Sequence, residues 1–295
     1  MNLKVALQLG RVSNLPTVWT NVLAGVALAG ALSDNAPPGR ARAGAATIAA
    51  LALVMSLFYV GGMWLNDAFD RHFDARLRPE RPIPSGRATA REVFVGGFAL
   101  LAAALLGLGL LAIAAPSAWS LMTCGVILTA LIVLYNMHHK DNPLSPILMG
   151  LCRVLVYLTA AAAVAPLSAR VYGGAAVLLS YLIGLTYVAR QENLSEVKNL
   201  WPIALLGVPF LYASTTGGLW MVLITVAFFV WVLHALSFLR SSPKPKIPQA
   251  VVALIAGISL LDAKLIAHEG QPAVAALALG GFALTLFLQR YIRGT

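Results

Sequence analysis

Charged residues are scarce in this sequence. Only 11% of its 295 residues are Asp, Glu, Lys or Arg, against about 25% in soluble domains, and 59% are hydrophobic. This balance excludes an ordinary soluble globular protein and indicates that most of the chain lies in a lipid bilayer.

Cysteine is also rare, and no stretch rich in glycine and serine divides the chain. Cys124 and Cys152 both lie in apolar segments, and their spacing fits neither a metal site nor a disulfide framework. We therefore expect two buried thiols without a chemical role. Because no linker or low-complexity tract is present, residues 1–295 are expected to form a single domain.

Ten apolar segments follow one another along the chain, and most approach the ~20 residues that a helix needs to cross a bilayer. The segment 200–215 is short and contains Pro202 and Pro209, so a tilted or broken passage is expected there. The pattern predicts an all-α fold, a polytopic membrane bundle of nine to ten transmembrane helices. The ten segments cover residues 12–32, 44–66, 92–114, 118–136, 145–166, 171–190, 200–215, 217–239, 249–267 and 272–290.

The net charge of +10 does not indicate nucleic-acid binding, because the basic residues are distributed as a membrane topology requires. If the N-terminus is cytoplasmic and all ten segments cross, most of the 21 lysines and arginines lie on the cytoplasmic side. If the short seventh segment did not cross, Arg240, Lys244 and Lys246 would move to the outer side. We therefore predict an integral membrane protein, in the inner membrane if bacterial, whose partners include anionic headgroups or phosphates.

An acidic run follows the second apolar segment. Asn66, Asp70 and Asp74 are spaced i, i+4, i+8 and share one helix face, with Asp67 one residue away. Oxygen ligands of this kind suit Mg²⁺, and Mg²⁺ in turn suits a diphosphate. A solvated helix end with ordinary charges is the alternative interpretation.

A basic loop follows directly. Arg78, Arg81 and Arg87 flank three prolines, which restrict the loop, and arginine is well suited to forked contacts with phosphate oxygens. Arg71, within the acidic run, is a further candidate for binding the substrate. A topology signal alone would also explain several of these arginines.

A second pair of acids, Glu192 and Glu196, ends the sixth apolar segment with i, i+4 spacing. Together with Lys198 the pair could bind metal and diphosphate from the other side, or form a salt-bridged surface patch. Lys140, at the end of the fourth segment, could reach a phosphate as a point charge. The neighbouring His138 and His139 point in different directions on a helix, so we interpret them as solvated interfacial residues.

Arg153 lies well inside the fifth apolar segment. A buried arginine in a membrane helix is costly unless it is paired or hydrated, so we expect it to contact an acid of the two clusters or an anionic substrate. Extension of its side chain to the cytoplasmic border is the competing account.

A last polar group consists of Asp262, Lys264, His268 and Glu269. The assigned topology places it towards the outer side, away from the acidic clusters. We expect a local structural pairing among these residues, with a proton or ion path as the alternative.

These motifs resemble those of the UbiA superfamily of intramembrane prenyltransferases. The run from Asn66 to Asp74 matches that family's NDxxDxxxD motif, and residues 78–87 match its RPxRPIPSGR run. The opening stretch 11–21 is similar as well, and the resemblance covers roughly residues 9–200. The finer pattern around the fourth and fifth segments resembles a branch called EboC-like.

The resemblance implies a bundle of about nine helices around a lateral, lipid-open cavity, under a cytoplasmic cap formed by loops near 67–91, 137–145 and 190–199. Two features depart from the family pattern. The second motif is Glu192 and Glu196 where the family usually has Asp, and the chain has ten apolar segments.

The leading hypothesis is Mg²⁺-dependent transfer of a polyprenyl group from an allylic prenyl diphosphate to a small hydrophobic acceptor, for which an aromatic ring is expected. The alternatives are a non-catalytic carrier of a lipid-linked precursor and an ion-coupled transporter that uses Asp262 and Lys264. The expected site comprises the catalytic residues Asp70, Asp74, Arg153 and Lys140, the substrate-binding residues Asn66, Asp67, Arg71, Arg78, Arg81, Arg87 and Lys198, and, as the resemblance implies, the metal ligands Asn66, Asp70, Asp74, Glu192 and Glu196.

Overall fold

A computed structural model of the chain describes residues 1–32, 43–140, 142–190, 201–212, 218–241 and 245–292. Its regular secondary structure is helical, and the described residues include no strand. The predicted all-α fold is therefore confirmed.

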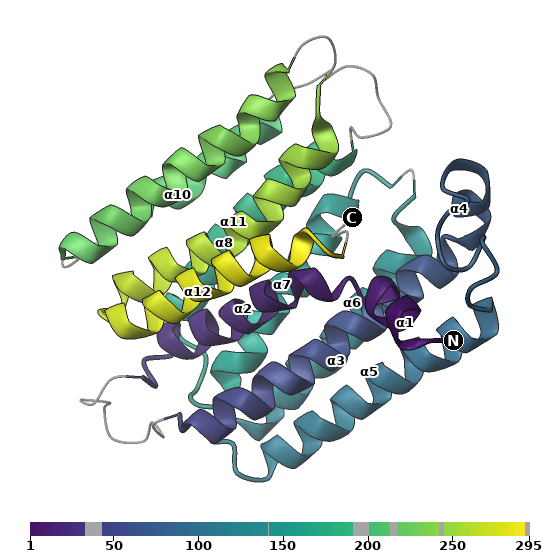
Figure 1. The fold of residues 1–295 in the computed structure, drawn as a ribbon. Helices are drawn as coiled ribbons and strands as arrows, with labels where there is room; N and C mark the ends of the chain where they lie inside the picture. The colour runs from purple at the N-terminus through teal and green to yellow at the C-terminus, as the bar shows by residue number, and fades with distance from the viewer. Residues whose placement is uncertain (33–42, 141, 191–200, 213–217, 242–244, 293–295) are drawn as a thin grey trace.

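The helices follow the apolar segments closely (Figure 1). The first part of the chain forms α1 (Leu3–Leu9), the 3₁₀ turn η1 (Val12–Asn14), α2 (Leu15–Leu28), α3 (Ala45–Phe69), α4 (Arg71–Leu77), α5 (Ala90–Ala112) and α6 (Ala118–His138). The second part forms α7 (Ser145–Ala162), α8 (Ala169–Arg190), η3 (Trp201–Gly207), α9 (Val208–Leu211), α10 (Leu219–Ser237), η4 (Phe238–Arg240), α11 (Ile247–His268) and α12 (Pro272–Gln289).

Eight helices of the described residues are long and apolar enough to cross a membrane. They are α3, α5, α6, α7, α8, α10 extended by η4, α11 and α12. The helix α2 has only 14 residues, but it is buried along most of its length within the bundle. The chain is an integral, multi-pass membrane protein.

The described part of the seventh apolar segment, residues 201–212, forms η3 and the single turn α9, as its prolines predicted. The last described residue is Tyr212, whose ring lies 3.7 Å from the position of a Cβ at Gly173, near the start of α8. The backbone carbonyl of Tyr212 accepts a hydrogen bond from Lys264 Nζ at 2.6 Å. Residues 201–212 therefore run beside α8 as short helical turns.

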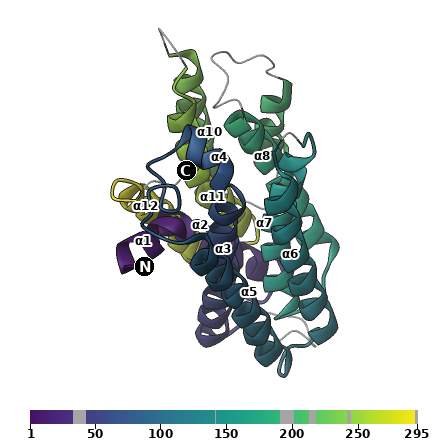
Figure 2. The ribbon, with the colours of Figure 1, turned by 90° about the vertical axis from the view of Figure 1, so that its right-hand side faces the viewer.

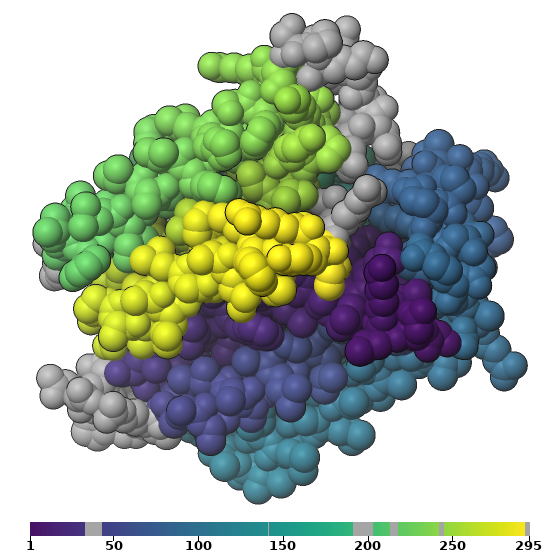
Figure 3. All heavy atoms as spheres, viewed as in Figure 1, coloured from purple at the N-terminus to yellow at the C-terminus, as the bar shows by residue number. Residues whose placement is uncertain are grey.

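The acidic run and the basic loop, residues 66–87, lie at one end of the bundle, which we call the motif end. Figures 1 and 2 show α1, α4 and the C-terminal end of α12 at this end. A hydrogen bond of 3.1 Å from Gln289 Nε2 on α12 to Asn14 Oδ1 joins the two ends of the chain. The motif end therefore contains polar side chains from both the start and the finish of the sequence, and in Figure 3 the yellow C-terminal helix lies beside the purple N-terminal segment.

Three helices form the centre of the bundle: α2, α7 and α11. Small residues allow them to approach closely, as is usual between membrane helices. At Gly25 of α2, an added Cβ would lie 2.6 Å from the carbonyl oxygen of Tyr157 and 3.0 Å from the Cβ of Ala160 on α7. α11 is buried along nearly its whole length, whereas α10 lies at the edge of the bundle against α11 (Figure 1).

We expect Gly25→Ala to lower the unfolding free energy by about 1–3 kcal/mol, because the backbone carbonyl of Tyr157 has no room to retreat from a methyl group. The thermal unfolding midpoint in detergent micelles measures the effect. Gly109→Ala on α5 is the matched control, since nothing lies within 4 Å of an added Cβ there. Equal midpoints for the two variants would contradict this account of the α2–α7 contact.

Candidate functional site

The acidic run lies at the junction of α3 and α4. Asn66 and Asp67 occupy the last turn of α3, Asp70 lies between the two helices, and Asp74 lies within α4. Backbone hydrogen bonds of 2.9 Å from Asp70 to Asn66 and from Asp74 to Asp70 continue the helical path across the junction. All four side chains are buried, so the alternative of a solvated helix end does not describe this structure.

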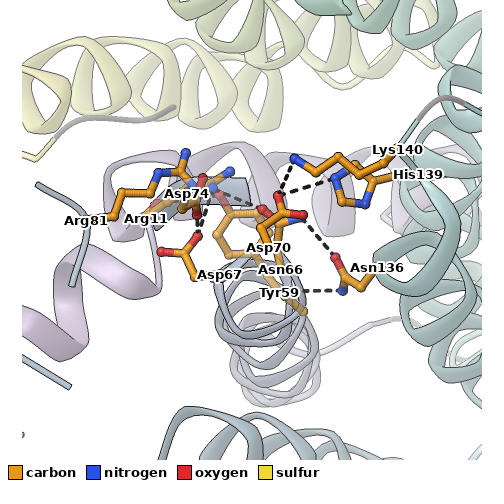
Figure 4. Close-up of polar contacts among 11 residues, drawn as sticks. Arg11, Tyr59, Asn66, Asp67, Asp70, Asp74, Arg81, Asn136, His139 and Lys140 are labelled. Carbon is orange, nitrogen blue, oxygen red and sulfur yellow. Dashed lines mark hydrogen bonds and ion pairs between the residues drawn. The ribbon is translucent and has the colours of Figure 1, made fainter. Parts of the chain in front are cut away.

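Asp70 faces the end of α6 (Figure 4). Its Oδ2 lies 3.1 Å from Lys140 Nζ and 3.4 Å from His139 Nε2. Lys140 also lies over the ring of Phe73, 3.4 Å from its centroid. Burial alone would raise the pKa of Asp70, but the hydrogen bonds and charges of His139 and Lys140 outweigh it and lower that pKa below its usual value.

Arg81, from the proline-rich loop, joins the other two carboxylates (Figure 4). Its Nη1 lies 3.2 Å from Asp67 Oδ1 and 3.0 Å from Asp74 Oδ2. Burial, together with the charges of Asp70 and Asp67, raises the pKa of Asp74 despite this ion pair with Arg81. The loop returns through a turn at Gly86, whose φ of +73° is readily available to glycine.

Arg11 completes this side of the cluster. It is the one non-glycine residue among those described that has a positive φ, at 42°, a conformation that is unfavourable for most side chains. Its Nη2 donates hydrogen bonds of 3.1 Å to both Asn66 Oδ1 and Asp67 Oδ1. The backbone conformation at Arg11 therefore accompanies a direct contact with the acidic run.

Asn136 holds Asn66, the remaining member of the motif, by a hydrogen bond. Its Oδ1 accepts a hydrogen bond of 3.1 Å from Asn66 Nδ2, and its Nδ2 donates one of 3.1 Å to the carbonyl of Gly62. Sequence reasoning did not assign site roles to Arg11, Asn136 or His139. Two signals were available: Arg11 begins the opening stretch of the family resemblance, and Asn136 is a lone amide in an apolar segment.

The interpretation of His139 as a solvated residue was wrong. Its ring stacks on Tyr135 with centroids 5.0 Å apart, and its side chain is 14% exposed. The contact with Asp70 explains this burial. His138 is exposed, as expected for an interfacial residue.

The structure does not bring all the predicted arginines to the cluster. Arg71 donates to the carbonyl of Ala68 at 3.0 Å and lies over the ring of Phe94. Arg87 is exposed and donates to Ser85 and Gln8 and to the carbonyl of Glu80. The remaining predicted residues lie elsewhere: Arg78 lines the larger cavity described below, and Glu192, Glu196 and Lys198 fall outside the described residues.

Two cavities adjoin the cluster. The larger, of about 660 Å³, lies between the basic residues of the motif end and the facing ends of α10, α11 and α12. Its walls include Arg11, Arg78 and Arg81 on one side and Trp231 and His234 on the other. The smaller cavity, of about 60 Å³, lies among α2, α3, α6 and α7 and is mostly apolar, with polar side chains that include Asn136 and Arg153.

Arg153 contacts none of the predicted acids that the structure describes. It is buried and donates hydrogen bonds to Asn21 Oδ1 at 2.9 Å and Thr17 Oγ1 at 3.0 Å, both on α2. Because its side chain is held inside the bundle, extension to the membrane border does not describe its position.

The polar residues at the end of α11 contact different partners. Asp262 accepts hydrogen bonds from Thr20, Asn21 and Tyr157, whereas Lys264 donates to the Tyr212 carbonyl. The expected pairing was therefore wrong for these two residues. It holds for His268 and Glu269, which lie 3.4 Å apart, although Glu269 also pairs with Arg170 at 3.1 Å.

The acidic run fits a divalent cation in its chemistry but does not form a complete site by itself. Carboxylate and amide oxygens are the donors that Mg²⁺ prefers. Within the described ranges, however, no three His, Cys, Asp or Glu side chains converge on one point. Asp70 faces Lys140, and Asp67 and Asp74 face Arg81, so a cation bound here would need ligands in addition to these side chains.

We expect Arg81→Met to lower the unfolding free energy by about 3 kcal/mol, because it leaves two buried carboxylates without their shared cation. Thermal unfolding in detergent measures the loss. Arg87→Met, in the same loop but exposed, should lower stability much less. A similar loss for both variants would show that the loop, and not the ion pairs, determines the effect.

Comparison with known proteins places the chain among prenyltransferases. The model of the UbiA prenyltransferase family matches residues 18–260. Digeranylgeranylglyceryl phosphate synthase from Ignicoccus hospitalis is 42% identical over 107 residues, which are 36% of this chain and 31% of that protein. The protein of the same name from Methanothrix thermoacetophila is 49% identical over 51 residues, 17% of this chain and 19% of that one.

A similar fold occurs in a solved structure described as giving insights into digeranylgeranylglyceryl phosphate synthase in membranes. It matches with a TM-score of 0.60 and 18% identity over 90% of this chain and 98% of that one. At this identity the likeness concerns the fold alone. Because the family model matches most of the sequence, this chain belongs to the UbiA prenyltransferase family.

Proposed function

We propose that this protein transfers a prenyl group from an allylic prenyl diphosphate to a lipid-soluble acceptor within the membrane. The observation that carries the proposal is the cluster at the α3–α4 junction. Buried carboxylates there alternate with Arg11, Arg81 and Lys140, directly beside an apolar cavity that Asn136 shares with the cluster. This arrangement suits a ligand with a diphosphate head and a hydrocarbon tail.

Asn66, Asp70 and Asp74 would hold Mg²⁺, together with Glu192 and Glu196 from the second motif. Mg²⁺, when bound, neutralises the diphosphate and makes it a better leaving group. The donor set has the right chemistry, and since no three acids of the described ranges converge on one point, we propose that the metal binds together with the diphosphate.

The basic residues have two tasks in this proposal. Without substrate they neutralise the buried acids; with substrate, Arg81 and Lys140 are placed to contact the oxygens of the departing diphosphate and to stabilise its charge. Arginine offers a forked contact and lysine a point charge. Arg78, at the wall of the larger cavity, is placed to guide an anionic headgroup to them.

The apolar helices have a separate task. Loss of the diphosphate leaves cationic character on the allylic carbon, and walls without water protect it until the acceptor attacks. The cavity among α2, α3, α6 and α7 supplies such walls next to the cluster. The described residues that line this cavity include no carboxylate or histidine to take the proton that the acceptor then loses.

The acceptor is proposed as one of two chemical classes. From the sequence, an acceptor with an aromatic ring is expected. The name of the relatives, digeranylgeranylglyceryl phosphate synthase, instead favours an acceptor that carries a glyceryl phosphate. We propose that the chain forms one domain whose motif end and N-terminus face the cytoplasm, as the distribution of basic residues favours.

The double variant Asp70→Asn/Asp74→Asn should reduce prenyl transfer about 100-fold or more, because it removes the charges that bind metal and diphosphate. Transfer is measured in membranes with a radiolabelled prenyl diphosphate. Glu92→Gln is the matched control: Glu92 is an exposed acid that caps the start of α5 and has no contact with the cluster.

The same assay separates the enzyme from a carrier. An enzyme releases diphosphate in step with prenylated product, whereas a carrier moves the intact donor and releases none. Wild-type membranes that translocate the donor without releasing diphosphate, or a double variant that transfers prenyl groups normally, would reject the proposal.

Metal and donor should stabilise the protein jointly. We expect Mg²⁺ with a non-reactive thiolodiphosphate analogue of the donor to raise stability by about 3 kcal/mol at ~100 times the dissociation constant. Either one alone should have little effect, because the described acids do not converge without a ligand. The readout is the thermal midpoint in detergent; an equal shift with Mg²⁺ alone would show that the protein forms the metal site unaided.

A further inference from the structure

A buried cation without an adjacent carboxylate lies in the middle of the bundle. Arg153 occurs halfway along α7 and is 7% exposed. Its two hydrogen-bond partners, Asn21 and Thr17, are both neutral. Within the described part of the chain no acid lies within ion-pair distance of it. Because charged groups in a membrane interior are usually paired, Arg153 is suited to a ligand that carries a negative charge.

The acid nearest to this network already accepts hydrogen bonds from other residues. Asp262, on α11, accepts hydrogen bonds from Thr20 at 2.5 Å, from Asn21 at 2.8 Å and from Tyr157. Asn21 stands between the two charges: its carbonyl oxygen accepts from Arg153, and its amide nitrogen donates to Asp262. The network therefore fixes the orientation of the guanidinium without neutralising it by direct contact.

A cavity lies beside Arg153 and is accessible to its remaining N–H groups. Two hydrogen bonds use only part of the donor capacity of a guanidinium, and Arg153 lines the 60 Å³ cavity among α2, α3, α6 and α7. A cavity needs about 10–15 Å³ of such volume to hold one water molecule, so this one has room beside Arg153 for the oxygens of a compact headgroup. The cavity also adjoins the acidic cluster, because Asn136 lines it and bonds to Asn66.

We propose that Arg153, held by Asn21 and Thr17, binds an oxyanion of the acceptor, either a carboxylate or a phosphate monoester. Both groups accept the forked contact that a guanidinium offers. The inference rests on the proposed function, since it names the chemistry of the second substrate. It assigns Arg153 to the acceptor, whereas the cations of the motif end serve the donor.

The test measures binding to purified protein in detergent and needs no turnover. The probes are two matched pairs: 4-hydroxybenzoate with 4-hydroxybenzyl alcohol, and geranylgeranylglyceryl phosphate with geranylgeranylglycerol. We expect the wild type to bind the charged member of one pair at least about tenfold more tightly than its neutral counterpart. The pair that shows this preference identifies the source of the oxyanion.

Variants at Arg153 test whether this residue causes the preference for the charged probe. Arg153→Met should bind charged and neutral members about equally, and Arg153→Lys should retain part of the preference. Lys264→Met is the matched control, because it removes another buried cation whose partner is the Tyr212 carbonyl. It should lower the thermal midpoint but leave the preference unchanged.

Several outcomes would overturn the inference. They are a wild type without charge preference in either pair, failure of both pairs to bind, and a folded Arg153→Met that keeps the preference. If Arg153→Met does not fold, the wild-type comparison and Arg153→Lys still decide the matter. Loss of prenyl transfer in the donor-site variants tests the proposed function separately, because donor binding does not involve Arg153.

Discussion

The fold depends on one electrostatic constraint, the burial of carboxylates at the border of an apolar helix bundle. A buried carboxylate costs free energy unless a cation or several donors compensate it. Asp70 and Asp74 obtain this compensation from Lys140 and Arg81, and Arg11 contributes from the N-terminal segment. Three separate parts of the chain therefore have to meet at the end of α3.

The same constraint operates at a second level, deeper in the bundle. Arg153 and Asp262 would be unfavourable alone in a membrane interior, and Asn21 links them through its two polar atoms. This link requires α2, α7 and α11 to approach closely, and glycine at position 25 allows the approach of α2 to α7. Packing and polar chemistry thus depend on the same contacts, and the cavity beside Arg153 lies among these helices and their neighbours.

In the proposed reaction the two levels serve the two substrates. The motif end gathers several cations and acids, which suits a diphosphate and a metal, whereas the inner level offers a single guanidinium in mostly apolar surroundings. We therefore assign the donor to the motif end and the acceptor to the inner level.

The sequence by itself determined the helical membrane fold, the short turns of the seventh segment and the placing of the acids at the end of one apolar helix, whereas the predicted single acidic face is divided, because Asp70 faces Lys140 while Asp67 and Asp74 face Arg81. These features follow from local rules: hydropathy over ~20 residues, proline geometry and helical periodicity. Only the tertiary structure decided which cation compensates which acid. Arg11 and His139 reach the cluster from distant segments, while Arg71 points away from it. The reason is that helix packing, and not spacing along the chain, determines which side chains of a bundle meet.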